Sequence, residues 1–97
     1  MIQINISESK PQIFGVYTPY GYYYFKFYWI ELQEGGWFLD ILDESKNNIV
    51  NGIAVVCNID LLEQFNYKLK FKMVFLSDKN YNPGRYNLHL QEVFLLW

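Results

Sequence analysis

Apolar residues recur at every second position along most of the chain, which is the spacing of β-strands with one buried face. Residues 2–6 begin with this alternation, and a short extended segment at 13–17 lies between two breakers that each contain proline. Residues 22–33 place large aromatic side chains on one face, and residues 37–42 repeat the alternation after Glu34-Gly35-Gly36. Because two glycines in succession permit a tight reversal, these two segments predict a β-hairpin.

The middle of the chain interrupts the strand pattern twice. Residues 49–57 form a predicted strand in which Asn51-Gly52 indicates a bulge or the close approach of another backbone. Residues 58–65 lose the alternation altogether. Asn58 or Asp60 is placed to cap a single helical turn there, with its apolar side chains packed inward.

Two further strands are predicted towards the C-terminus. The clearest alternation of the chain covers residues 69–75, and an apolar strand at 93–97 follows the polar loop 77–87. Six or seven strands with short connections and one helical turn predict an all-β fold, either a small antiparallel barrel or a sandwich.

The length of 97 residues fits one domain with one hydrophobic core. We expect a single all-β domain over residues 1–97, with an N-terminal strand and loop at 1–21 followed by the core region at 22–97. The alternation assigns these residues to the buried core: Phe25, Phe27, Trp29, Trp37, Leu39, Ile41, Leu61, Leu62, Phe65, Phe71, Met73 and Phe75.

The aromatic content exceeds what one small core can bury. Nine Tyr, eight Phe and three Trp make up 21% of the chain. Each buried ring hides about 150–250 Å², so the full set would need on the order of 3,000–5,000 Å². Aromatic residues are enriched at the centres of protein interfaces. The excess therefore predicts an interface, for which the candidates are Tyr22, Tyr24, Tyr28, Phe94 and Trp97.

Few residues offer catalytic or metal-binding chemistry. Cys57 is the only cysteine, which excludes an internal disulfide and a multi-cysteine zinc site, and its apolar neighbours predict a buried structural thiol. His89 is the only histidine and has no second metal ligand beside it, so we expect a surface or hydrogen-bonded side chain. We predict no enzymatic activity, no cofactor and no metal, because the carboxylates sit at predicted turns without a catalytic spacing: Glu31, Glu34, Asp40, Asp43 and Glu44.

Lysines near tyrosines leave a second hypothesis open. The exposed face of the predicted strand 69–75 carries Lys68, Lys70 and Lys72. An OB-like protein binds single-stranded nucleic acid with a face of this kind, in which basic and aromatic side chains alternate. However, lysines on an exposed strand also prevent aggregation, and a net charge of −2 does not attract a polyanion. A carbohydrate-binding module is a third alternative.

The sequence shows no sign of export or membrane insertion. The N-terminus lacks a cationic start followed by an apolar run, and no stretch reaches 18 apolar residues. We therefore expect a soluble protein, made in the cytoplasm, with no membrane partner.

Four short motifs follow one another along the chain. They are Phe25-x-Phe27-x-Trp29, Gly36-Trp37-Phe38-Leu39-Asp40-Ile41, Ile49-x-x-Gly52-Ile53 and Asp60-Leu61-Leu62-x-Gln64-Phe65. In this order and spacing they resemble a family of small phage tail proteins, the plug-type domain of a cyanophage baseplate. The likeness runs from about Tyr22 to the C-terminus.

The resemblance implies a structural component of a contractile tail, located at the baseplate centre near the hub and the end of the tail tube, without catalytic residues. It also implies that Gly52 is a backbone constraint and that Leu61, Leu62 and Phe65 close one end of a barrel. The partners would be hub and tube-end proteins in the virion, after synthesis in the host cytoplasm. Several copies, most simply three, would surround the tail axis.

Overall fold

A computed structural model describes residues 1–6, 8–31, 36–77, 83, 88 and 92–97. These residues form seven β-strands and one short 3-10 turn, η1. The elements are β1 (Ile2–Ile4), β2 (Gln12–Thr18), β3 (Gly21–Ile30), β4 (Gly36–Leu42), β5 (Asn48–Ala54), η1 (Glu63–Phe65), β6 (Lys72–Leu76) and β7 (Glu92–Leu96).

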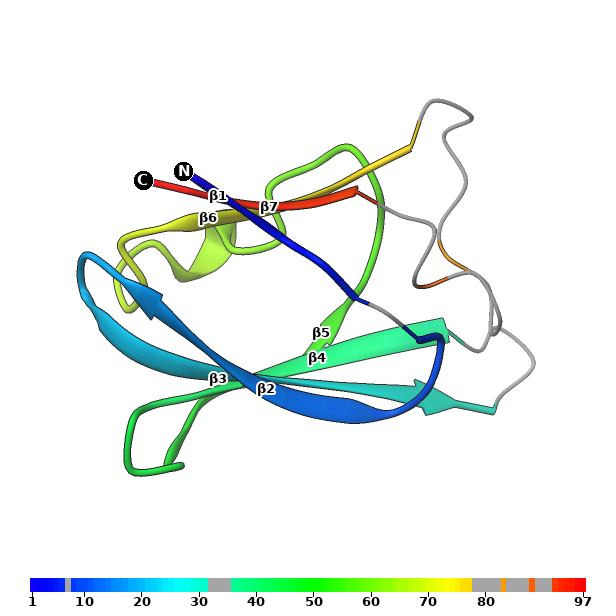
Figure 1. The fold of residues 1–97 in the computed structure, drawn as a ribbon, viewed down its shortest axis with the longest axis horizontal. Helices are drawn as coiled ribbons and strands as arrows, with labels where there is room; N and C mark the ends of the chain where they lie inside the picture. The colour runs from blue at the N-terminus through cyan, green and yellow to red at the C-terminus, as the bar shows by residue number, and fades with distance from the viewer. Residues whose placement is uncertain (7, 32–35, 78–82, 84–87, 89–91) are drawn as a thin grey trace.

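The strands build two antiparallel sheets that pack face to face (Figure 1). The upper sheet in Figure 1 has the order β1-β7-β6, and the lower sheet has the order β2-β3-β4-β5. The predicted all-β fold is therefore confirmed, in its sandwich form. The barrel alternative is not formed, because no ladder among the described residues connects the two sheets into a closed ring.

The predicted hairpin is the pair β3 and β4. Their register pairs Phe25 with Ile41 and Phe27 with Leu39, so apolar side chains meet on the buried face. The turn Glu34-Gly35 lies outside the described residues. β2 also pairs with β3 along its whole length, which the sequence did not reveal, because residues 13–17 read only as an isolated extended segment.

The interruption at Asn51-Gly52 is a β-bulge. Leu39 pairs with Ile53 while Ile41 pairs with Val50, so β5 holds one more residue than β4 over this interval. Gly52 has a φ of 71°, a conformation that other residues rarely adopt. No atom lies within 4 Å of the position that a Cβ would take there, so the bulge interpretation is correct and the close-approach alternative is not.

The strand predicted at 69–75 is shorter at its start than the alternation indicated. β6 begins at Lys72, which pairs with Leu96. Among the described residues, the ladder between β6 and β7 contains no pair before this one. Leu69 and Phe71 are nevertheless buried and continue the apolar face into the core.

The predicted helical turn is the 3-10 turn η1. One carboxylate oxygen of Asp60 accepts hydrogen bonds from the backbone N–H of Leu62 at 3.0 Å and of Met73 at 3.2 Å. Asp60 thus fastens the residue before η1 to the edge of β6, whereas the N-cap position of η1 is Leu62 and has no side-chain cap. The side chain of Asn58 instead bonds the backbone of Ser77.

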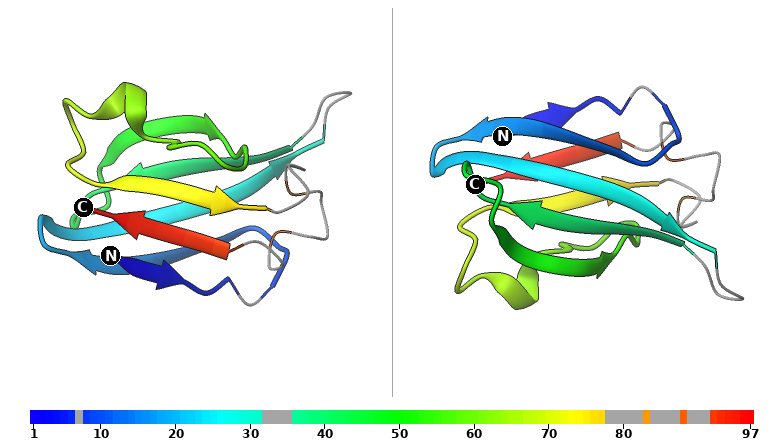
Figure 2. Two further views of the ribbon diagram at one scale, coloured as in Figure 1. Left: turned by 90° about the horizontal axis from the view of Figure 1, so that it is seen from above. Right: turned by 90° about the horizontal axis from the view of Figure 1, so that it is seen from below.

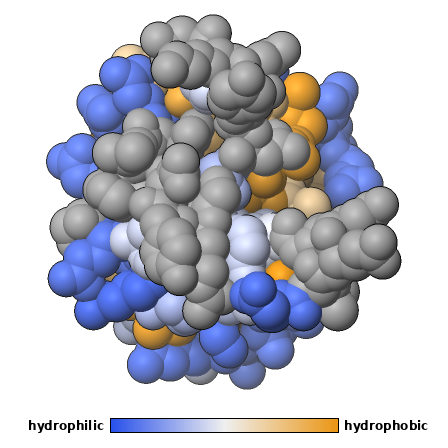
Figure 3. All heavy atoms as spheres, turned by 90° about the vertical axis from the view of Figure 1, so that its right-hand side faces the viewer, coloured by the Kyte–Doolittle hydropathy of each residue, from blue (hydrophilic) through white to orange (hydrophobic). Residues whose placement is uncertain are grey.

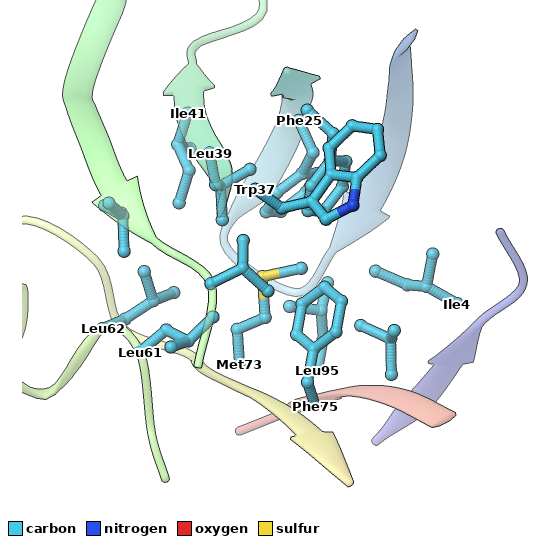
Figure 4. Packing of buried hydrophobic residues seen from close by; sticks show 14 of the residues in the cluster. Ile4, Phe25, Trp37, Leu39, Ile41, Leu61, Leu62, Met73, Phe75 and Leu95 are labelled. Carbon is cyan, nitrogen blue, oxygen red and sulfur yellow. The ribbon is translucent and has the colours of Figure 1, made fainter. Parts of the chain in front are cut away.

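The core lies between the two sheets, where side chains from both meet (Figure 4). Among the predicted core residues, Trp29 and Phe65 are half-buried against this cluster and the other ten are buried. Leu61 and Leu62 enter it from beside β6. Because no barrel forms, they line the space between the sheets and do not close a barrel end. The thiol of Cys57 is also buried.

The two ends of the chain lie close together at one end of the sandwich (Figures 1 and 2). The segment 1–21, predicted as an N-terminal strand and loop of the single domain, contains one strand of each sheet. β1 pairs with β7 and β2 pairs with β3. Both sheets therefore depend on this segment for an edge strand.

Candidate interaction surfaces

The outer side of the four-stranded sheet carries a row of tyrosines. We define the tyrosine face as five outward side chains of β2 and β3, namely Ile13, Tyr17, Tyr22, Tyr24 and Tyr28. Lys26 lies on the same outward side, between Tyr24 and Tyr28 and opposite Ile13. The rings of Tyr17 and Tyr22 lie 4.4 Å apart, and those of Tyr22 and Tyr24 lie 5.2 Å apart, both edge to face. These distances are favourable for aromatic pairs, so neighbouring rings fix one another.

A glycine makes room for this row. A Cβ at Gly15 would overlap the ring of Tyr22, so that ring lies directly over the Gly15 backbone. The ammonium group of Lys46 lies 5.1 Å from the centre of the Tyr24 ring, within the range of a cation–π contact. The tyrosine face is thus a built surface, in which Tyr17 is 79% exposed.

Tyr28 joins the tyrosine face to the bulge. Its hydroxyl donates to Asp40 Oδ1 at 2.9 Å, and the same oxygen accepts from the backbone N–H of Gly52 at 2.8 Å. Burial raises the pKa of the Tyr28 phenol, and its hydrogen bond to the negative Asp40 raises that pKa further. The sequence analysis grouped Asp40 with carboxylates at turns. The structure places it in β4, where it stabilises the fold by holding Tyr28 and Gly52.

The outer side of the three-stranded sheet carries an apolar groove. Five side chains line a hollow of about 290 Å³, and all are apolar: Met1, Val74, Leu76, Phe94 and Leu96. Met1 is 70% exposed and Leu76 is 42% exposed. A sheet with two apolar faces is unusual in a free monomer, because the outward face of an antiparallel sheet is normally polar.

The predicted interface residues lie on two different faces. Tyr22, Tyr24 and Tyr28 belong to the tyrosine face, whereas Phe94 lines the apolar groove of the other sheet. Trp97 follows β7 and is 46% exposed. The structure therefore separates the single predicted interface into two surfaces.

Several residues of these surfaces were missed in the sequence. Ile13 and Tyr17 were read only as part of an extended segment, and Val74 was grouped with the polar side of its strand. The available signal was that Val74 and Leu76 follow Lys72 at every second position, which makes both faces of β6 apolar.

The three lysines of the nucleic-acid hypothesis do not form a row along one strand. Only Lys72 lies in a strand, and Lys68 and Lys70 precede it. Lys68 Nζ donates to the carbonyl of Ile49 at 3.3 Å and lies 5.7 Å from the centre of the Tyr67 ring. This lysine is therefore engaged in local contacts.

Two hollows flank η1. One of about 430 Å³ is lined by Ile53 and Leu61 among others, and one of about 500 Å³ lies beside Leu62 and Lys70. Asp60 borders both, but its carboxylate is occupied by backbone N–H groups. Over the described parts of the chain, no three His, Cys, Asp or Glu side chains gather in a way that could hold a metal ion.

Two further carboxylates of the predicted set, Asp43 and Glu31, also have local roles. Asp43 Oδ1 accepts from the backbone N–H of Ser45 and of Asn47, both at 2.9 Å, which closes the turn between β4 and β5. Glu31 accepts from the indole N–H of Trp29 at 2.7 Å. Glu34 and His89 lie outside the described residues.

At the end of the sandwich drawn in Figure 3, hydrophilic residues surround the rim and hydrophobic atoms gather at the upper right.

The described residues contain no helix of the length and apolarity that crossing a membrane requires.

No curated protein matches the sequence. A sequence model of one protein family, described as "Cyanophage baseplate Pam3 plug gp18", matches residues 1–97. This match covers the whole chain and so reaches beyond the motifs that begin near Tyr22. The chain therefore belongs to the family of the cyanophage baseplate plug.

Proposed function

We propose that the protein is a structural component of a contractile phage tail baseplate, or of a related particle, packed as a plug near the central hub and the end of the tail tube. The observation that carries this proposal is the family match over the entire chain. A match of that extent includes both sheets and both surfaces, so it concerns the whole fold.

The two surfaces support a role between neighbouring proteins. The apolar groove and the tyrosine face lie on opposite outer sides of the sandwich. Leu76 and Tyr17 expose 42% and 79% of their surface to water in the isolated chain. Covering such side chains is favourable by about 25 cal/mol per Å² of apolar area. A subunit held between two neighbours would gain this stabilisation on both sides.

The proposed role is structural and not enzymatic. Asp40, Asp43 and Asp60 use their carboxylates to hold backbone N–H groups of a bulge, a turn and the start of η1. These carboxylates therefore support the fold, as a packing subunit requires.

The proposed partners are the hub and tube-end proteins of the baseplate, with further copies of the chain arranged around the tail axis. Three copies are the simplest symmetric number for that position. The subunit would be made in the host cytoplasm and then become part of the virion.

A pair of surface variants tests the proposal. Trp97→Asp places a charge directly after β7 at a side chain that is 46% exposed, and Tyr67→Asp makes the same kind of change at a 69% exposed ring between η1 and β6. Each variant is supplied to particles that assemble without the native protein. We expect both to fold, Tyr67→Asp to enter the particles, and Trp97→Asp to be at least tenfold depleted in them.

Particle content is measured by quantitative immunoblot, and folding by circular dichroism and melting temperature. Equal incorporation of the two variants at normal melting temperatures would contradict the proposed contact through the end of β7. Absence of the native protein itself from purified particles would contradict the baseplate role.

A further inference from the structure

The four edges of the two sheets differ in how they are protected from pairing with another chain. β5 carries the bulge, and Lys68 donates to its Ile49 carbonyl. The outer edge of β6 is covered by bridges to Cys57 and Asp60. β1 has only three residues. Bulges, covering segments and short length are the usual means by which proteins block an edge strand.

As far as the described residues show, β2 has none of these protections. Gln12–Thr18 is seven residues long, contains no charge and no proline, and pairs with β3 in an unbroken register from Gln12 to Thr18. Within the described part of the chain, its other edge pairs with no strand. Figure 2 shows β2 along one long side of the sandwich, the side on which β1 also lies. An extended, uncharged and regular edge is a template for another strand.

We infer that, in solution, a second copy of the chain pairs with this edge, β2 against β2, about a two-fold axis at Gly15. The two four-stranded sheets would then form one continuous sheet of eight strands. This inference rests on the edge alone and does not depend on the proposed baseplate role.

The sequence around Gly15 supports a second copy as the occupant, because it is self-complementary about that residue. The order Gln-Ile-Phe-Gly-Val-Tyr-Thr reads polar, apolar, apolar, glycine, apolar, apolar, polar, and Pro11 and Pro19 bound it at equal distances. An antiparallel two-fold pairing at Gly15 places Ile13 opposite Tyr17 of the second copy, and Tyr17 opposite its Ile13. A two-fold interface needs this kind of self-complementarity.

The same register fits the other side of the strand and the backbone. Phe14 would face Val16 of the second copy, and both side chains pack towards the core in the single chain. In this register odd-numbered residues pair with odd-numbered residues and even with even. The backbone N–H and C=O groups that point away from β3 in one copy therefore face the same groups of the other copy. Such a pairing gives about six to eight hydrogen bonds. Because only one seven-residue strand of each copy takes part, the contact is small, and we expect a dissociation constant in the micromolar range.

Two charge variants test both the pairing and its register. Ile13→Glu with Tyr17→Lys places opposite charges face to face across the axis, whereas Ile13→Glu with Tyr17→Glu places like charges there. Both variants carry Ile13→Glu, and residue 13 pairs with Lys26 of β3 within the same chain. Both also lose the contact between the rings of Tyr17 and Tyr22. They differ only in the charge at position 17, so any difference in association reports the contact across the axis.

The mass in solution is measured by sedimentation equilibrium from about 5 to 500 μM, and folding by circular dichroism. The inference predicts that the native chain and the opposite-charge variant shift from 11.7 kDa towards twice that mass, while the Glu/Glu variant stays monomeric. If Glu/Glu does not fold, a Lys/Lys variant serves in its place. A monomeric native chain at 500 μM, or equal behaviour of the two charge variants, would overturn the inference.

Discussion

Asp40 shows how one side chain ties together three parts of the fold. It lies on β4, accepts a hydrogen bond from Tyr28 on β3, and accepts another from Gly52 in the bulge of β5. A half-buried carboxylate that accepts from two donors stabilises the strands that supply them, because each donor exchanges a bond to water for a bond to the carboxylate. The outward tyrosine of the hairpin is thereby held in place.

The raised pKa of Tyr28 predicts a pH dependence of stability. In the unfolded chain this phenol ionises near pH 10, whereas in the folded chain burial and Asp40 keep it protonated to higher pH. The folded state then binds more protons than the unfolded state above about pH 10, so the stabilisation is fully present below that pH and is lost as the pH rises.

The measurement compares the native chain with Tyr28→Phe, which cannot ionise. At pH 8 we expect the native chain to be more stable by about 1 kcal/mol, the usual contribution of such a hydrogen bond. From about pH 10 upward this advantage should shrink. An advantage that stays constant up to pH 11 in urea unfolding experiments would contradict the assigned environment of the phenol.

At the scale of single elements, the bulge in β5 depends on the backbone of Gly52. Its φ of 71° is left-handed, and a residue with a Cβ pays about 1–2 kcal/mol to adopt it. Because no atom lies within 4 Å of the added Cβ, this cost is conformational and not steric. We expect Gly52→Ala to destabilise the fold by about that amount and Gly52→Asn by less, since asparagine tolerates this region.

Gly36→Ala is the matched control for the bulge. A Cβ at Gly36 also meets no atom within 4 Å, and its φ is not positive. We expect this change to leave the free energy of unfolding within about 0.5 kcal/mol or to increase it slightly. Chemical denaturation of the three variants measures the effect, and equal losses for Gly36→Ala and Gly52→Ala would rule out a conformational role for Gly52.

The elements differed in how far the sequence could predict them. The hairpin β3–β4 was predictable because both strands alternate strictly and the glycine pair Gly35-Gly36 stands where the second strand begins. The start of β6 was not, because alternation continues through Leu69 and Phe71 although, among the described residues, no strand pairs with them. Strand length depends on the partner, and a single segment carries no information about where its partner ends.

At the scale of the whole molecule, one tryptophan joins the two sheets. Trp37 on β4 is 2% exposed, packs within the cluster between the sheets, and contacts the ring of Trp29 edge to face. We expect Trp37→Ala to lower the free energy of unfolding by about 3–5 kcal/mol, because the lost contacts leave a cavity that the sheets cannot fully close.

Tyr67→Ala provides the comparison for this loss, because it also removes a large aromatic side chain but from a position that is 69% exposed. Its expected cost is below about 1 kcal/mol. Denaturant midpoints of both variants measure the difference, and a similar loss for the two would show that Trp37 does not have the packing role described.

The division of the aromatic residues into two surfaces could not be predicted. The excess of aromatic residues predicted an interface, but Tyr24 and Phe94 are placed on opposite sides only by the pairing of β3 in one sheet and β7 in the other. That pairing joins segments far apart in the sequence. Alternation indicates which side chains share a face within one strand, and it does not indicate which strands share a sheet.

The most direct test of the baseplate role locates the protein in the particle. Density-purified particles are probed with an antibody to this chain and examined by electron microscopy with gold-labelled secondary antibody. The proposed function predicts label at the distal end of the tail and depletion of the protein from the soluble fraction of the lysate. Protein that remains in the soluble fraction, with tails free of label after mild opening of the baseplate, would contradict it.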